Sequence, residues 1–164
     1  MIGFRVEPTV GEQALEQWRH VHNVVVPPAA LSPEQVAERA GRNRLENAYV
    51  GDVLVGCSTV RPPEGEQRAV TVIARVLPEF RRRGYGDALY RHALAHAREM
   101  DAGVIETCVL AANTEGLAFA RARGFDEVER YTLDAGSGEW WVDLRITNLG
   151  PGSGNTVWAE SRSS

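Results

Sequence analysis

Three consecutive arginines and two nearby glycines form the chemically most specific stretch of the chain. They are Arg81, Arg82, Arg83, Gly84 and Gly86. Glycine lets the backbone approach a ligand because it carries no Cβ. The first turn of a helix presents unpaired N–H groups and a partial positive charge, which suit phosphoryl oxygens. A β-branched run precedes these residues and an amphipathic run follows them, so the segment predicts a pyrophosphate socket at a strand–helix corner.

The spacing of these residues excludes two common phosphate-binding loops. The chain contains neither a Gly-x-x-x-x-Gly-Lys-Ser/Thr segment nor a Gly-x-Gly-x-x-Gly segment. The stretch from Arg81 to Gly86 instead reads Arg-x-x-Gly-x-Gly. This pattern resembles the acetyl-CoA signature of the GNAT superfamily of N-acetyltransferases, Gln/Arg-x-x-Gly-x-Gly/Ala.

A second motif supports this resemblance. Asn113, Ala118-Phe119 and Arg123-Gly124-Phe125 are similar to the family's Asn-x-x-Ala-x-x-Phe/Leu-Tyr-x-x-x-Gly-Phe helix, with the alanine one place later than usual. The resemblance covers residues 1–146. It implies acetyl-CoA as the cosubstrate and an amine as the acceptor.

Hydrophobic periodicity and turn residues predict the secondary structure. Strands are expected over 4–6, 47–50, 53–60, 69–76, 103–110, 125–133 and 140–146, and helices over 11–25, from Ser32, 84–100 and 113–123. The second helix would begin with a capping box, in which Ser32 is the cap, Pro33 the first helical residue and Gln35 the reciprocal partner. This order predicts an α/β (α+β) fold of the GNAT type. Its sheet would be mixed, mostly antiparallel, with six to seven strands and helices on both faces. We expect a single domain over residues 1–147 and a Gly/Ser-rich extension over 148–164.

Composition narrows the class of protein. Of the 164 residues, 43% are hydrophobic and 24% charged, as in ordinary soluble globular proteins. No apolar run approaches the ~20 residues of a membrane span, and the N-terminus has no signal-peptide pattern. We therefore expect a cytoplasmic protein with no membrane partner. The net charge of −4 argues against nucleic-acid binding and mildly favours a cationic substrate.

The basic residues and the potential metal ligands add two further expectations. All 18 basic residues are arginine, which is typical of a GC-rich genome and favours a bacterial source. Cys57 and Cys108 lie far apart without CxxC spacing, so neither a disulfide framework nor a zinc site is indicated. His92 and His96 have a spacing that can bind metal, but an exposed helical face is the favoured interpretation because no third ligand is near. We expect no metal.

The resemblance assigns the cofactor contacts residue by residue. Backbone N–H groups from Arg82 to Asp87 would hold the pyrophosphate, and an N–H near Val76 would stabilise the oxyanion. Backbone groups of Ala74 and Val76 would pair with the pantetheine arm. Asn113 would contact the same arm, cap a helix, or do both. The complete predicted cofactor-binding set is Ala74, Val76, Arg81, Arg82, Arg83, Gly84, Tyr85, Gly86, Asp87 and Asn113.

The catalytic positions depart from the family pattern. Members that acetylate protein N-termini carry a general-base Glu five residues before the Asn and a general-acid Tyr seven residues after it. Here these positions hold Cys108 and Ala120, so no catalytic residue is assigned. Cys108 is either a weak base or nucleophile or, as we favour, a small packing residue. Loss of the base favours an α-amino group (pKa ~7.7–8.0) over a lysine amine (pKa ~10.4), or a base from elsewhere.

Other residues remain open alternatives for proton transfer or acceptor binding. Glu106 shares a strand face with Cys108, where it would either point toward the active site or pair with an arginine. Tyr131 replaces the missing phenol only if its side chain faces the cleft. His20 and His22 lie on the first helix, on the acceptor side in the family.

Together these features predict an N-acetyltransferase acting on a small-molecule amine or a free amino terminus, by direct attack on the thioester. The alternative is a non-catalytic acyl-CoA sensor, and a third option is a protein that binds another phosphorylated ligand. A homodimer is compatible with the family, and Trp140-Trp141 would suit either a dimer seam or an acceptor pocket.

Overall fold

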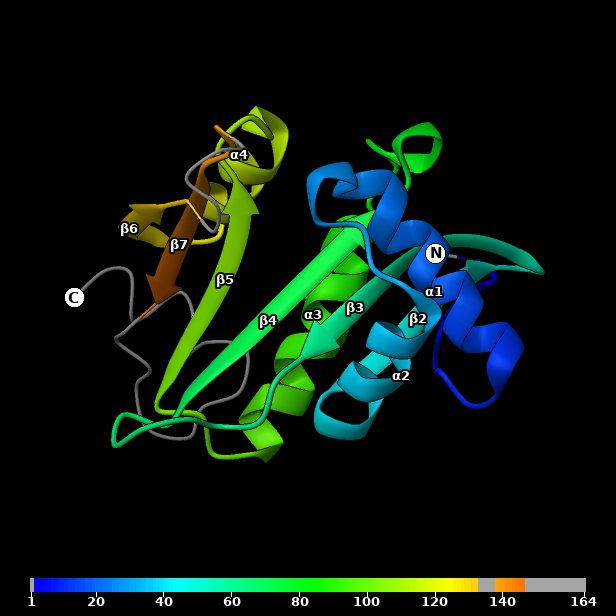
Figure 1. Ribbon diagram of the computed structural model, residues 1–164, viewed down its shortest axis with the longest axis horizontal. Coiled ribbons are helices and arrows are strands. Elements are labelled where there is room, and N and C mark those ends of the chain that lie inside the picture. Colours follow the sequence, from blue (N-terminus) through cyan, green and yellow to red (C-terminus); the bar gives the residue numbers. More distant parts are fainter. Residues whose placement is uncertain (1, 133–137, 147–164) are drawn as a thin grey trace. The chain divides into compact units, whose positions relative to one another are not determined.

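The computed structural model describes residues 2–132 and 138–146 and contains two compact units (Figure 1). The N-terminal unit comprises the described residues within 1–62 and 72–100, and the C-terminal unit comprises those within 63–71 and 101–164. Strand β4 (Ala69–Val76) contributes its first residues to the C-terminal unit and its remainder to the N-terminal unit.

The N-terminal unit is built on an antiparallel sheet. Strand β1 (Phe4–Pro8) pairs with β2 (Arg44–Val50), which pairs with β3 (Val53–Val60), which in turn pairs with β4. The turn between β2 and β3 places Gly51 at φ 59°, a conformation that glycine adopts without the usual steric penalty.

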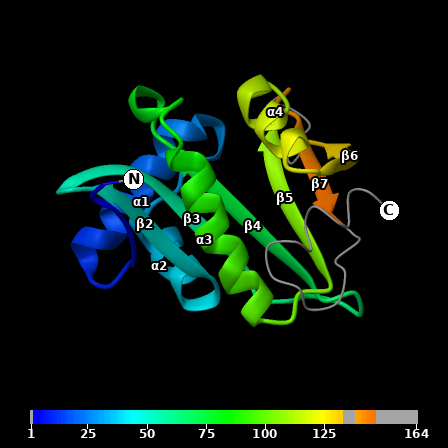
Figure 2. The same ribbon diagram turned by 180° about the vertical axis from the view of Figure 1, so that it is seen from behind.

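Helices cover both faces of this sheet. Helices α1 (Glu12–Val25) and α2 (Pro33–Arg42) lie on one face, and α3 (Tyr85–Glu99) lies on the other (Figures 1 and 2). On the first face, Trp18 is buried and donates its indole N–H to the Ser58 carbonyl at 3.1 Å. On the second face, Leu89 is fully buried against Ala48 and Val55.

The C-terminal unit holds the other strands. The start of β4 pairs in parallel with β5 (Val104–Leu110), and β7 (Trp141–Ile146) lies antiparallel between β5 and β6 (Asp126–Tyr131). Helix α4 (Thr114–Ala122) packs so closely on β5 that a Cβ on Gly116 would approach Val109 Cγ1 to 2.9 Å. Val142, Leu144, Ile146, Leu117 and Phe125 are buried in this unit.

These pairings confirm the predicted fold class. The hydrogen-bonded strand order is β1-β2-β3-β4-β5-β7-β6, a seven-stranded mixed sheet in which the β4–β5 ladder is parallel. The predicted capping box at Ser32 is present, with Gln35 N donating to Ser32 Oγ and Ser32 N donating to Gln35 Oε1.

The structure differs from the sequence-based expectation in a few places. Strand β2 begins at Arg44, three residues before the predicted start at Asn47. Short 3₁₀ turns occur at η1 (Pro27–Ala29) and η2 (Pro78–Phe80). The predicted extension over 148–164 and most of the connection between the last two predicted strands fall outside the described residues. The single domain over 1–147 stays a prediction. In the described ranges, no helix has the length and apolar character of a membrane span.

Candidate functional site

The corner between β4 and α3 presents an uncapped helix N-terminus. Gly84 is the N-cap residue in the left-handed conformation, with φ 84°, and its neighbour Arg82 also has a positive φ of 64°. Among residues 2–132 and 138–146, no side chain caps this end of α3. Because the first N–H groups of a helix have no partner within it, those of Tyr85 and Gly86 at the start of α3 can bind a ligand. The positive end of the helix dipole favours an anion there.

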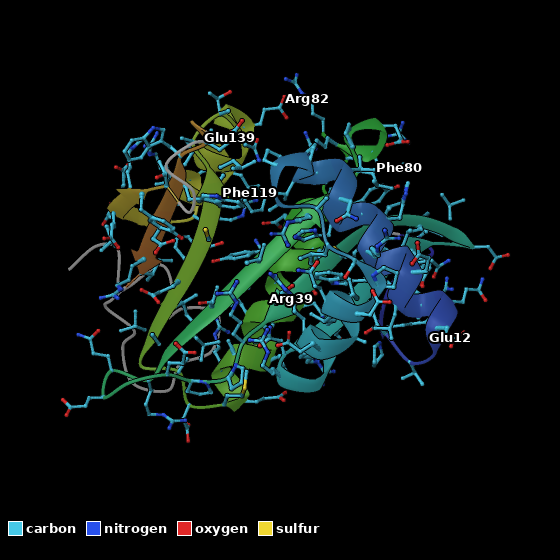
Figure 3. The ribbon with its side chains drawn as sticks, viewed as in Figure 1. Glu12, Arg39, Phe80, Arg82, Phe119 and Glu139 are labelled. Carbon is cyan, nitrogen blue, oxygen red and sulfur yellow. The ribbon has the colours of Figure 1, made fainter. Side chains whose placement is uncertain are left out.

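Side chains within the corner hold this geometry in place. Arg81 donates from Nε to the Val76 carbonyl at 3.0 Å, which ties the loop back to β4. The ring of Tyr85 stacks on Phe4 with centroids 5.7 Å apart. Arg83 lies 5.8 Å from the Phe80 ring centroid, whereas Arg82 extends outward from the loop (Figure 3). Arg81 and Tyr85 are therefore structural parts of the predicted socket.

The carboxylate and second glycine of the motif lie in the first turn of α3. Asp87 accepts from Arg91 Nε at 2.8 Å, one turn further along the helix. Gly86 follows Tyr85 as the second residue of the helix. The structure thus brings the predicted residues 81–87 into one corner of the N-terminal unit.

Strand β4 offers an edge beside this corner. The β3–β4 ladder continues to the Gly56↔Val76 pair, and Leu77 N donates to the Val55 carbonyl at 2.9 Å. The ladder with β5 ends at Thr71↔Glu106. In the described part of the chain, residues 72–76 therefore pair with a strand on one side only. Such an edge can pair with an extended ligand, as a further strand would.

Asn113 is the N-cap of α4. Its Oδ1 accepts from Gly116 N at 2.9 Å, which confirms the capping interpretation. Its Nδ2 makes no hydrogen bond with the described residues. The amide donor is therefore open to a ligand, and contact with the pantetheine arm stays a prediction.

Cys108 belongs to a hydrogen-bonded cluster on the face of the C-terminal sheet opposite Val142 and Leu144. Tyr131 donates its hydroxyl to Asp143 Oδ1 at 3.0 Å, and Cys108 Sγ lies 3.5 Å from the same hydroxyl. Because the Tyr131 proton is directed at Asp143, the thiol is the donor to the Tyr131 oxygen. Burial, with further contributions from Cys108 and Asp143, raises the pKa of Tyr131 above its ordinary value.

Two of the remaining candidates have structural partners. Glu106 accepts from Arg145 at 3.0 and 2.5 Å, which confirms its interpretation as the partner of an arginine. His92 Nδ1 lies 3.4 Å from the buried Glu46 carboxylate. No group of three potential metal ligands occurs in the ranges 2–132 and 138–146.

His22 is buried and neutral. Its ring stacks on Trp18 with centroids 5.2 Å apart. The Asn23 amide is oriented by Leu31, whose N–H donates to Asn23 Oδ1 at 2.9 Å and whose carbonyl accepts from Nδ2 at 3.0 Å. Asn23 Oδ1 is thus an acceptor, so His22 Nδ1, 2.9 Å away, carries the proton. Burial and the charge of Arg75 lower the pKa of His22 from 6.5 to about 4.

A group of arginines near His22 was not found by sequence reasoning. Burial lowers the pKa of His22 most, and the charges of Arg75 and Arg39 lower it further. Burial also lowers the pKa of Arg39 most; the charges of Arg61 and Arg42 add to this effect and that of Glu38 opposes it. These residues are far apart in sequence and carry no motif. Arg75 lies opposite Cys57 in the β3–β4 register, and Arg39 lies on α2.

Comparisons with known proteins agree with the fold. The sequence model of the Acetyltransferase (GNAT) family matches residues 10–125. No curated protein sequence matches the chain. The ribosomal-protein-alanine N-acetyltransferase of Brucella melitensis is 18% identical, with a TM-score of 0.69, over 86% of this chain and 98% of its own.

Two similar structures contain acetyl-CoA or CoA. The yncA protein of Salmonella typhimurium, with its cofactor acetyl-CoA, is 12% identical with a TM-score of 0.68, over 88% of this chain and 94% of its own. An acetyltransferase of Bacillus subtilis in complex with CoA is 20% identical with a TM-score of 0.67, over 88% of this chain and 98% of its own.

Proposed function

The chain belongs to the acetyltransferase (GNAT) family, and we propose that it transfers acetyl from acetyl-CoA to a primary amine of a small molecule or a free amino terminus. The observation that carries the proposal is the N-terminus of α3 behind Gly84, next to residues 72–76 of β4; among the described residues, no side chain caps the helix and only β3 pairs with this part of β4. One feature suits a pyrophosphate and the other suits an extended arm.

The corner and the edge divide the binding of acetyl-CoA between them. Backbone N–H groups from Arg82 to Asp87 bind the pyrophosphate, supported by the arginine charges. Backbone groups of Ala74 and Val76 pair with the pantetheine arm, and the Asn113 amide donates to it. An N–H near Val76 stabilises the thioester oxygen as it becomes negatively charged, an effect typically of ~3–4 kcal/mol.

The acetyl group passes directly to the amine. The nitrogen lone pair attacks the thioester carbon, the C–S bond breaks, and the CoA thiolate takes a proton from solvent. This step assigns no role as a base or a nucleophile to Cys108, whose thiol lies 3.5 Å from the Tyr131 hydroxyl. The acceptor must then bind with its amine already partly neutral, which favours an amine of low pKa.

An acyl-CoA sensor is the second candidate. The observation in its favour is that Cys108 and the buried Ala120 occupy positions where relatives that acetylate N-termini carry their base and acid. Such a protein would bind CoA through the same corner and edge without transferring the acetyl group.

Thiol release tests the proposal. The full chain is incubated with acetyl-CoA and a panel of small amines and peptides, and free CoA is measured together with the acetylated product. We expect release that depends on an amine. Stabilisation by CoA without release for any amine would favour the sensor, and no stabilisation by CoA would point to another phosphorylated ligand, since a ligand at 100 times its Kd stabilises by ~2.7 kcal/mol.

A further inference from the structure

The edge of β4 that faces away from β3 presents backbone groups at alternate residues. Leu77 N donates to the Val55 carbonyl at 2.9 Å, and the register places Val76 opposite Gly56. In an antiparallel ladder, hydrogen-bonded pairs alternate with pairs whose N–H and C=O groups point away from the partner strand. The Val76 pair is of the second kind, so its N–H and C=O point away from β3. The same alternation applies to Ala74, and these are the two residues that we assign to the pantetheine arm.

A side chain already occupies the Val76 carbonyl. Arg81 donates from Nε to this oxygen at 3.0 Å. The short 3₁₀ turn η2 folds the loop back toward the strand and makes this contact possible. Within this turn, Phe80 N donates to the Leu77 carbonyl at 3.0 Å, and the next residue donates its N–H to the Pro78 carbonyl at 3.3 Å. The half-buried guanidinium of Arg81 therefore lies at the edge where the arm would pair.

The other donors of the Arg81 guanidinium are unused. Neither Nη group makes a hydrogen bond or an ion pair with the residues that the structure describes. Hydrogen bonds from a guanidinium to a charged oxygen are roughly twice as strong as those to a neutral one, and two parallel bonds match a phosphoryl group. An anion within reach would therefore draw Arg81 away from a neutral carbonyl.

The loop that carries Arg81 also carries the pyrophosphate socket. Arg81 precedes Gly84 by three residues, and Gly84 is the N-cap of α3. The side chain of Arg81 thus connects the loop of the socket to the backbone that would hold the arm. Both features belong to the N-terminal unit.

We propose that Arg81 makes binding of the acetyl donor depend on the pyrophosphate of acetyl-CoA. In the free protein, Nε occupies the position on the Val76 carbonyl that an amide N–H of the arm would use. A pyrophosphate in the socket draws the guanidinium to its oxygens and leaves this carbonyl to the arm. Arg81 is therefore a specificity-determining residue, which selects acetyl-CoA over thioesters that have the same arm and no phosphate. This inference rests on the proposed function, which places acetyl-CoA at this corner and edge.

Two fragments of the cosubstrate test this coupling in the wild-type chain. Pantetheine contains the arm without the pyrophosphate, and inorganic pyrophosphate fills the socket alone. The Kd for pantetheine is measured by NMR titration of the full chain with saturating pyrophosphate and with sodium chloride of equal ionic strength. We expect pyrophosphate to tighten pantetheine binding about tenfold, because the bond from Arg81 to Val76 no longer has to be broken. Pantetheine binding that is equal, weaker or undetectable with pyrophosphate would overturn the inference.

Arg81→Met separates this coupling from a merely structural role. Methionine keeps an unbranched side chain and has no donor for the Val76 carbonyl or for a phosphate. We expect pantetheine alone to bind about tenfold more tightly than to the wild type, with no further gain from pyrophosphate. CoA should bind less tightly, because its phosphates lose a charged contact. If Arg81 only fastened the loop to β4, both ligands would bind less tightly, which would overturn the inference.

Arg82→Gln is the matched control. It removes the same charge from the same loop, at an exposed side chain that extends outward in Figure 3. Pantetheine should not bind more tightly to this variant, and its coupling to pyrophosphate should persist. Equal tightening in Arg82→Gln and Arg81→Met would assign the effect to overall charge and overturn the inference.

These binding measurements separate this inference from the proposed function. Coupling between pantetheine and pyrophosphate that is lost in Arg81→Met supports the role of Arg81 even if no amine is acetylated. Thiol release that depends on an amine, together with fragments that bind independently, refutes the role of Arg81 alone and leaves the proposed function standing.

Discussion

The side chain of Asn113 has two groups with different roles, an oxygen that caps α4 and an amide nitrogen that we expect to bind the cofactor. Its Oδ1 caps α4 through Gly116 N at 2.9 Å, while its Nδ2 has no partner among the described residues. Asn113→Ala removes both groups. Loss of an N-cap costs about 1 kcal/mol, which lowers Tm by about 2–4 °C for a chain of this size. Loss of one hydrogen bond to the cofactor, about 0.5–1.5 kcal/mol, weakens CoA binding roughly two- to tenfold.

Asn113→Ser distinguishes these two effects. Serine caps helices about as well as asparagine but has no amide to reach a ligand. We therefore expect wild-type Tm and weakened CoA binding in Asn113→Ser, against losses of both in Asn113→Ala. Tm is measured by calorimetry without ligand, and Kd by titration with CoA. Wild-type CoA affinity in Asn113→Ser would refute the contact with the pantetheine arm, and an unchanged Tm in Asn113→Ala would refute the energetic value of the cap.

Three further predictions address the socket, the buried histidine and the thiols. Gly84→Glu should abolish measurable CoA binding by calorimetry, while Gly65→Glu, at a similar φ of 70° in an open loop, should retain it; equal losses would refute the pyrophosphate placement. His22 has a folded-state pKa of about 4 against 6.5 unfolded, so its stabilising contribution is complete above pH 6.5 and is lost as pH falls toward 4. The loss is roughly 3 kcal/mol. In His22→Gln, the denaturation midpoint should therefore depend less on pH over that range, and an unchanged pH dependence would count against a lowered pKa of His22. Burial raises the pKa of Cys57 to about 12, so a thiol reagent should modify no more than Cys108 in the native protein and both cysteines after unfolding; native labelling of Cys57 would contradict its burial.

Local signals in the sequence were sufficient to predict most of the helices and strands. Ser32, Pro33 and Gln35 specify the start of α2 through groups within four residues of one another, and the structure confirms the capping box. The corner at Gly84 is equally local, because a glycine with positive φ precedes an amphipathic run. Such elements are predictable because their stabilising contacts are between neighbours in sequence.

Features that depend on strand register could not be predicted. The early start of β2 places Glu46 in the sheet, where its buried carboxylate meets Arg44 at 3.1 Å and His92 at 3.4 Å. A buried glutamate does not fit the hydrophobic periodicity from which strands are predicted. Its partners are on the same strand and on α3. Contacts between elements decide its position, as tertiary contacts often override local preference.

The proton chemistry of the site depended on register in the same way. Sequence reasoning identified Cys108 and Tyr131 separately. Their contact with each other, and that of Tyr131 with Asp143, requires the pairing of β5, β7 and β6, with an irregularity between Glu127 and Glu129. A shift of one residue would turn these side chains to the other face. Only the structure therefore shows that the Cys108 thiol is a hydrogen-bond donor.

The central claim is that this chain passes an acetyl group from acetyl-CoA to an amine. The most direct measurement is single-turnover thiol release from acetyl-CoA in the presence of an amine, with the product identified by mass. We predict one acetylated amine for each CoA released and no acetyl group retained on the protein. CoA binding without release for any amine, or an acetyl group left on Cys108, would contradict this mechanism.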